Sequence, residues 1–349
     1  MLEKGRKMKT TTIKDIAKKL VISFSTVSRA LSNDPVVNVK TAHRIKQMAA
    51  EMDYTPNLAA RGLVRGKSEA IAFISTRFAA PFISNVLDSF EQRAFYTNRY
   101  VHGISPYSTR NEEELKELLL KRILRSKMAD AVVMLTIKPR EETLKDFNAA
   151  KVPVILIENA MKGAHSITIN NQSGAEKAVN HLLDGGRRNI GLIIGETMQP
   201  PSRDVNAAAV ERKLGYVAAH EKRGLHIKDN NIEVIHAYIY EEGKKALDNF
   251  LKKPVKPDAI FCAAGDIVAM GVLERADELG IKIPGDMAVI GYDDVLAARH
   301  LNPPLTTVRQ PLEDIGTMAF DMAIEAIDGK LKKDKNVVID PELIIRESA

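Results

Sequence analysis

The 349-residue sequence lacks the features that mark several large classes of protein. Its one cysteine, Cys262, cannot form an internal disulfide, and the apolar residues around it predict a buried thiol. No stretch of about 18 uncharged apolar residues is present, so we expect no membrane span. The basic residues 1–9 are not followed by an apolar segment. We therefore expect no secretory signal, and the cytoplasm is the default location.

Sequence patterns of catalysis and of bound cofactors are missing as well. Eight histidines and one cysteine form no cluster with metal-ligand spacing, so we expect no metal. Gly191 and Gly195 follow an apolar run but lack the full Gly-x-Gly-x-x-Gly spacing of a dinucleotide site. No nucleophile elbow or Ser-His-Asp arrangement is recognisable. Neither an enzyme nor a cofactor is expected.

Basic charge is concentrated at the start of the chain. Residues 1–67 contain 14 Lys and Arg against 5 Asp and Glu, a net charge of +9. The remainder contains 37 against 40, a net charge of −3. A basic segment on a mildly acidic body favours contact with a polyanion, and nucleic acid is the obvious candidate. A solvated basic face without a partner would explain the charge alone equally well.

Residues 10–56 have the pattern of three short helices. Thr12 and Asp15 fit a capping box, after which apolar residues recur at helical spacing. Ser23 is the expected cap of a second helix and Asn38 that of a third. The first two helices, separated by a short break, therefore have the arrangement of a helix-turn-helix.

In a helix-turn-helix the second helix enters the major groove and its first residues touch base edges. Here Phe24 and Ser25 would lead that helix, and Arg29 could reach a guanine with two donors. The alternative is a small helical bundle with exposed Ser and Thr. Phosphate contacts, which position the helix without specifying sequence, are expected from Ser23, Thr26 and Ser28. Thr12 is also expected to lie at the DNA.

After residue 67, short apolar runs alternate with longer amphipathic stretches. This alternation predicts parallel sheets covered by helices on both faces, and about 280 residues favours two lobes over one. The expected strands are 70–74, 131–135, 152–157, 190–194, 259–262 and 287–290. The expected helices are 82–96, 112–126, 174–183, 211–223, 243–251 and 268–279.

Short motifs follow one another in a recognisable order along nearly the whole chain. In the basic segment they are residues 12–17, 25–31 and 54–57, with Ala60 and Leu63. In the body they are residues 212–216, 265–271, 289–294, 303–310 and 342–348. Together they resemble the motifs of the LacI/GalR family of bacterial transcriptional regulators.

The resemblance implies an α/β protein with an N-terminal all-α helix-turn-helix head. The body would be of the periplasmic-binding-protein type, with two doubly wound, parallel-sheet lobes and a ligand cleft between them. The implied boundaries are 10–56 for the head, 57–67 for a hinge helix or linker, and 68–349 for the body. The first lobe would comprise about 68–168 and 310–339, and the second about 169–309 and 340–349.

The resemblance also implies partners. A homodimer would place two heads on a near-palindromic operator in double-stranded DNA. Hinge residues Asn57, Ala60 and Leu63 would contact that DNA. Leu63 would wedge into the minor groove and bend the duplex, the alternative being that it packs against the partner hinge. A small polar effector, a sugar or sugar derivative, would control the affinity for DNA, and the protein would act as a repressor.

Effector contacts are implied for six residues. Arg212 and Asp293 resemble the family's cleft residues, and a guanidinium and a carboxylate offer complementary donors and acceptors to a polar ligand. The charged residues could instead form a surface or interlobe salt bridge. The other residues at similar positions are Arg77, Phe82, Glu158 and Asp266.

Two positions depart from the family pattern. Val21 stands in the helix-turn-helix turn, where glycine is usual. A left-handed valine costs roughly 1–2 kcal/mol, so a slightly different turn is expected. Gly265 stands where asparagine is common, which weakens the expectation of a typical sugar. A ligand-binding protein without gene control and a Rossmann-type enzyme remain as alternative functions.

Overall fold

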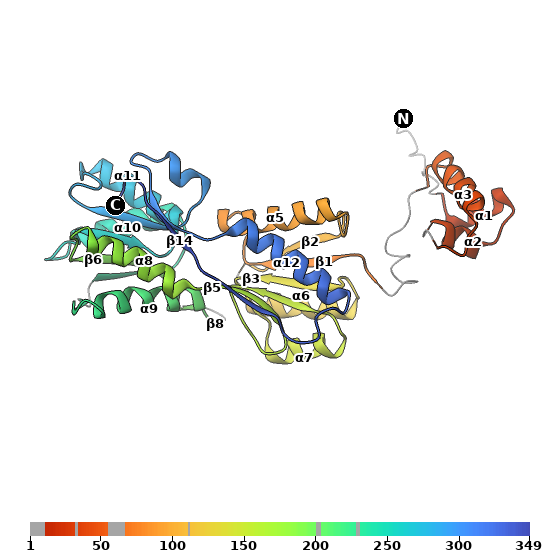
Figure 1. Ribbon diagram of the computed structural model, residues 1–349, viewed down its shortest axis with the longest axis horizontal. Helices are drawn as coiled ribbons and strands as arrows, with labels where there is room; N and C mark the ends of the chain where they lie inside the picture. Colours follow the sequence, from red (N-terminus) through yellow and green to blue (C-terminus); the bar gives the residue numbers. More distant parts are fainter. Residues whose placement is uncertain (1–10, 32–33, 55–66, 111, 200–203, 228–230) are drawn as a thin grey trace, which may run out of the picture. The chain divides into compact units, whose positions relative to one another are not determined.

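The computed structural model describes residues 11–31, 34–54, 67–110, 112–199, 204–227 and 231–349. The chain divides into two compact units, Met1–Ser68 and Glu69–Ala349. The first contains short helices only among its described residues, and the second contains two sheets with their covering helices (Figure 1). Each unit has its own hydrophobic core.

The first unit is a three-helix head, made of α1 (Ile13–Leu20), α2 (Phe24–Leu31) and α3 (Val39–Glu51). Thr12 and Asp15 form the expected capping box, in which each side chain bonds to the other residue's backbone N–H. The Ser23 hydroxyl accepts from the N–H of Thr26 at 3.1 Å, and the Asn38 side chain accepts from the N–H of Lys40. The three helix starts predicted from capping residues are thus confirmed.

Val21 ends α1 in the left-handed conformation, with φ 54° and ψ 46°. Its backbone N–H reaches the carbonyl groups of Ala17 and Lys18, which closes the last helical turn. The side chain is 89% exposed and makes no packing contribution to the head. A β-branched residue therefore holds the left-handed conformation that glycine adopts without cost.

The first lobe of the body is a six-stranded parallel sheet in the order β13-β5-β4-β3-β1-β2. Helices α5 and α12 cover one face and α6 and α7 cover the other (Figure 1). The strands are β1 (Ile71–Ser75), β2 (Ile104–Ser108), β3 (Ala131–Leu135), β4 (Val154–Ile157), β5 (His165–Ile169) and β13 (Asn336–Ile339). The helices are α5 (Pro81–Thr97), α6 (Glu113–Arg125), α7 (Glu141–Ala149) and α12 (Leu312–Ile327).

The second lobe has the sheet order β14-β12-β11-β10-β6-β9, parallel except for β14. Helices α8 and α9 cover one face and α10 and α11 the other. The strands are β6 (Ile190–Gly195), β9 (Ile232–Ile235), β10 (Ala259–Cys262), β11 (Ala288–Asp293), β12 (Thr306–Arg309) and β14 (Glu342–Ile344). The helices are α8 (Asn171–Asp184), α9 (Ala207–Glu221), α10 (Tyr240–Leu251) and α11 (Asp266–Glu278). Smaller elements are β7 (Met198–Gln199), β8 (Asp204–Val205) and a 3₁₀ helix (Leu296–His300).

The chain crosses between the lobes three times, after β5, after β12 and after β13. Two doubly wound sheets with helices on both faces confirm the predicted fold class. Cys262 is fully buried in the core between the second sheet and α10 and α11, as its apolar surroundings predicted. Among the described helices, none is both long and apolar enough to span a bilayer.

We expect Val21→Gly to stabilise the head by up to about 1 kcal/mol. Relief of roughly 1–2 kcal/mol of left-handed strain should exceed the added entropy of glycine in the unfolded chain. Hydrogen exchange of α1 and α2 amides in the full chain measures this free energy. Val39→Gly is the matched control, since Val39 is also exposed but helical, and it should lower protection. Loss of protection in both variants would contradict strain at Val21.

Candidate nucleic-acid interface and ligand cleft

The start of α2 presents exposed side chains from a helix whose other face is buried. Val27 and Ala30 pack into the head core, whereas Phe24 and Ser25 lie on the surface. Arg29 is also exposed, and its Nε lies 3.9 Å from the Asp34 carboxylate. An exposed ion pair at that distance contributes little. Arg29 therefore remains available to another anionic or acceptor group.

Hydroxyl groups gather at the same end of α2. The Ser23 hydroxyl lies 2.8 Å from that of Ser25 and 2.7 Å from that of Thr26. Ser28 is half-buried one turn further along. The Thr12 hydroxyl donates to Asp15 within the capping box, so its first role is structural. The predicted hinge contacts Asn57, Ala60 and Leu63 lie outside the described residues.

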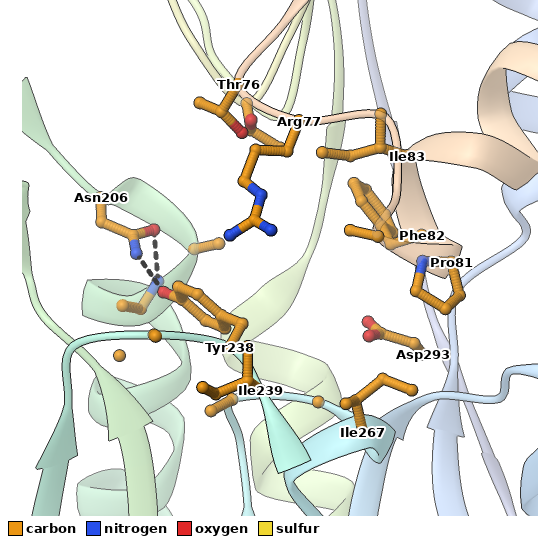
Figure 2. Close-up of a pocket in the computed structure, with 18 of the residues that line it drawn as sticks. Thr76, Arg77, Pro81, Phe82, Ile83, Asn206, Tyr238, Ile239, Ile267 and Asp293 are labelled. Atoms are coloured by element: carbon orange, nitrogen blue, oxygen red, sulfur yellow. Dashed lines mark hydrogen bonds between the residues drawn. The ribbon is translucent and has the colours of Figure 1, made fainter. Parts of the chain in front are cut away.

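A cleft of about 850 Å³ opens between the two lobes of the body. It is lined by residues that directly follow β1, β3, β4, β9 and β10, by the end of β11, and by the first residues of α5, α9, α10 and α11. The carboxyl ends of parallel strands are where open α/β sheets bind ligands, because loops and helix N-termini converge there. Figure 2 shows Arg77 and Phe82 from the first lobe and Asp293 from the second lobe facing this space.

Arg212 is buried at the floor of the cleft and contacts both lobes. Its Nε donates to the Asn171 side chain at 2.8 Å, and its Nη1 donates to the Ala263 carbonyl at 2.8 Å. The guanidinium carbon lies 3.7 Å from the centre of the Tyr292 ring, a cation–π contact. Across the lobes, Nη2 lies 3.8 Å from a carboxylate oxygen of Glu158. An interlobe salt bridge, the alternative to effector binding for these charged residues, is therefore present within the cleft itself.

Glu158 and Asp293 are the acidic partners of Arg212. Burial raises the pKa of Glu158 to about 7, and the nearby Asp293 charge adds to the shift while Arg212 opposes it. Burial likewise raises the pKa of Asp293 to about 6, against the opposing effects of Arg212 and Gln310. Both acids sit on backbone with positive φ, 62° for Glu158 and 112° for Asp293. Strained backbone of this kind clusters at ligand sites.

Asp266 does not line the cleft. Its carboxylate is fully buried, where it accepts from the Thr307 hydroxyl at 2.6 Å and the Val295 N–H at 2.9 Å. It thereby ties α11 to β12 and to the loop after β11, and the effector contact predicted for it does not fit this placement. Neighbouring Gly265 has φ 118°, and a Cβ there would lie 2.9 Å from an Asp293 oxygen.

Three neutral residues line the cleft but were not predicted from the sequence as effector contacts: Gln310, Asn206 and Tyr238. Gln310 donates to the Asp293 carboxylate at 2.5 Å, and its own side-chain oxygen is buried without a partner. Asn206 donates to the Tyr238 hydroxyl at 2.7 Å, an interaction visible in Figure 2. Gln310 is the last residue of the motif 303–310, so the sequence offered a signal for it. The sequence offered no such signal for Tyr238, and for Asn206 only its position as the cap of α9.

Groups of His, Cys, Asp and Glu that could hold a metal ion are absent from the part of the chain that the structure describes. The cleft instead combines guanidinium groups, carboxylates and other hydrogen-bonding groups with apolar walls such as Phe82 and Ile267. The charged lining residues are Arg77, Arg110, Arg212, Glu158, Glu196, Glu241 and Asp293. This composition suits a small polar organic ligand.

The chain resembles known proteins along most of its length. The sequence pattern of the bacterial regulatory proteins of the lacI family matches residues 12–57, and that of the periplasmic binding protein-like domain matches residues 179–349. The HTH-type transcriptional repressor PurR of Serratia proteamaculans is 31% identical over 342 residues, covering 97% of this chain and 96% of that protein. Among relatives, PurR of Edwardsiella ictaluri is 30% identical, with the same coverage of 97% and 96%.

Solved structures share the fold at lower identity. The Lac repressor dimer bound to operator and the anti-inducer ONPF matches with a TM-score of 0.83 and 22% identity, covering 97% of this chain and 99% of that one. The complex of the transcriptional regulator CelR with cellobiose matches with a TM-score of 0.70 and 24% identity, covering 97% and 100%.

We expect the stability of the Glu158→Gln variant, relative to the parent, to rise by on the order of 2 kcal/mol between about pH 4.5 and pH 7. The folded-state pKa of Glu158 is about 7 against the ordinary 4.5, so ionisation costs folded-state stability as pH rises through this interval. Glutamine cannot ionise. Urea unfolding across the interval measures the difference, with exposed Glu142→Gln as control. A pH-independent difference between parent and Glu158→Gln would contradict the raised pKa.

Proposed function

Because the chain belongs to the lacI family of bacterial regulatory proteins, we propose that it is a transcriptional repressor controlled by a small polar effector. The head binds the operator, and the effector occupies the cleft between the lobes. The observation that carries the second part is the buried Arg212–Glu158 pair at the cleft floor. This ion pair links the two lobes at the position that a ligand in the cleft would occupy.

The operator contacts are proposed for the exposed face of α2. Phe24, Ser25 and Arg29 reach outward from a helix fixed by its buried side, as recognition of base edges in the major groove requires. Hydroxyl groups of Ser23 and Thr26 lie beside them and would donate to phosphates. The basic charge of residues 1–67 supplies the electrostatic attraction to DNA.

The effector proposed for the cleft is carbohydrate-like. The related CelR was solved with cellobiose, and this cleft offers the paired carboxylates, guanidinium and amide groups that bind polar ligands of that kind. A ligand shifts the protein only by its differential affinity for two lobe arrangements. Contacts to Arg77 on one lobe and Asp293 on the other would provide that difference.

We also propose a homodimer, which would present two heads to a near-palindromic operator. The relative of known structure was solved as a dimer on its operator. On this chain, Phe95 and Tyr96 at the end of α5 are 68% and 77% exposed and stack edge to face. Two large adjacent aromatic rings in water favour coverage by a partner surface.

Arg29→Ala should weaken binding to the specific operator by about 1–3 kcal/mol, because a bidentate contact to guanine is lost. Binding to random duplexes should weaken much less. Titration of the full chain with operator and scrambled duplexes at equal salt measures both. Lys46→Ala on α3 controls for the loss of one positive charge. An equal loss on both duplexes for Arg29→Ala would remove its role in base recognition.

Arg212→Ala should abolish the effector response, because Glu158 and Asp293 lose their cation and the ligand loses its donors. An effector is first selected by thermal shift from a library of sugars and sugar acids. The readout is the ratio of operator affinities with and without it. Arg223→Ala, which removes an exposed salt bridge to Asp184 in the same lobe, should keep the parental ratio. A parental ratio for Arg212→Ala would exclude it from effector binding.

A further inference from the structure

Negative charge exceeds positive charge at the floor of the cleft. Glu158 and Asp293 approach Arg212 there, so a single guanidinium faces two carboxylates. Arg212 also divides its donors between Asn171 and Ala263. The other Arg and Glu residues that line the cleft are Arg77, Arg110, Glu196 and Glu241. Each is partly or fully exposed, so water screens its charge. With both acids ionised, the floor carries a net charge of −1.

The floor of the cleft also has too few hydrogen-bond donors for its buried acceptors. Oε1 of Glu158 and Oε1 of Gln310 are both buried and accept no hydrogen bond. The Glu158 side chain is only 9% exposed, so water does not replace the missing donors freely. Leaving a buried acceptor unsatisfied costs about 1–3 kcal/mol, and more for a charged group. The occupant of the cleft must therefore bring donors to this position.

Gly265 adds to the shortage of hydrogen-bond donors at the floor of the cleft. It stands directly before α11 and has no side chain that could donate to Asp293. A Cβ built on Gly265 would lie 2.9 Å from one carboxylate oxygen of Asp293. Figure 2 shows the Asp293 carboxylate turned toward the open space of the cleft. Its other oxygen accepts from Gln310. One carboxylate oxygen of Asp293 is thus directed at the ligand position.

We propose that the effector is an amino-polyol, such as an amino sugar, whose protonated amine lies against Asp293 and compensates the charge of Glu158. This inference rests on the proposed function and narrows its ligand class. A hydroxyl group supplies a donor but no charge. An ammonium group supplies three donors together with the missing positive charge, and its hydrogen bonds to carboxylates are stronger than neutral ones.

Proton uptake is the alternative way to neutralise this floor. Burial raises the pKa of Glu158 to about 7, so near neutral pH the carboxyl group is protonated in part of the population. The titratable and charged groups that face it are Arg212, Asp293, Glu211, Tyr238 and Tyr292. An ammonium group competes with this proton. Amine binding should therefore tighten as pH rises from about 5.5 to 7, a range in which the amine of an amino sugar stays mostly protonated, whereas binding of a hydroxyl analogue should not.

The test compares matched pairs that differ in one group: glucosamine and glucose, galactosamine and galactose, and 1-amino-1-deoxyglucitol and glucitol. Calorimetric titration of the full chain at about pH 7, where the amines are mostly protonated, gives the affinity for each. In at least one pair the amine should bind about tenfold tighter or more, a difference of roughly 1.4 kcal/mol. Failure of every amine to exceed its hydroxyl partner, including failure of every amine to bind, overturns the proposal.

Two variants test whether the preference for amines over their hydroxyl analogues depends on the charge of Glu158. Glu158→Gln keeps the shape of the side chain and removes its charge, so the amine preference should fall to about threefold or less and its pH dependence should flatten. Glu142→Gln, exposed on α7, should keep the parental preference. An unchanged preference in Glu158→Gln overturns the assignment.

Operator titrations separate this proposal from the proposed function. If an amine binds preferentially without changing operator affinity, the ligand class stands and the regulatory function fails. If a neutral sugar changes operator affinity while no amine exceeds its partner, the regulatory function stands and the ligand class fails.

Discussion

The charge of Arg212 governs the arrangement of the effector cleft. A buried guanidinium is costly unless its donors are satisfied, and here Asn171, the Ala263 carbonyl and the Tyr292 ring satisfy it within the second lobe. Its remaining attraction reaches Glu158 across the cleft. The second lobe thus holds a fixed cation, Arg212, at the lobe boundary, and the first lobe supplies its acidic partner, Glu158. A ligand that enters between these groups changes an interaction on which the relative position of the lobes depends.

The support for Asp293 shows how the crossing segments contribute to this site. The next residue, Asp294, has a side chain that is only 2% exposed, and it accepts from Arg309 at 2.7 Å and Arg346 at 2.6 Å. Arg309 ends the strand before the second crossing, and Arg346 follows the strand after the third. These bonds hold the backbone at positive φ on both Asp293 and Asp294. Movement at the crossings would therefore reach the ligand-facing carboxylate directly.

How far the sequence predicts the structure depends on burial. The central strands β3, β6 and β10 are continuous apolar runs, and such runs mark strands covered on both faces. The edge strands β2 and β13 were missed because their residues are partly exposed, and β2 also contains Pro106. In the cleft, charged Arg212 and Asp293 carried a motif signal, whereas neutral Tyr238 did not. Asp266 lies outside the cleft because its buried carboxylate accepts hydrogen bonds from Thr307 and Val295, long-range contacts that sequence spacing does not encode.

The central claim is that the cleft and the head are thermodynamically coupled, and reciprocity tests it most directly. The selected effector is titrated into the full chain alone and into the full chain saturated with operator, and the operator is titrated with and without effector. If the two sites are coupled, the factor by which DNA changes effector affinity equals the factor by which effector changes DNA affinity, and it lies in the range of about 5–150-fold. The same effector affinity with and without operator would contradict the account.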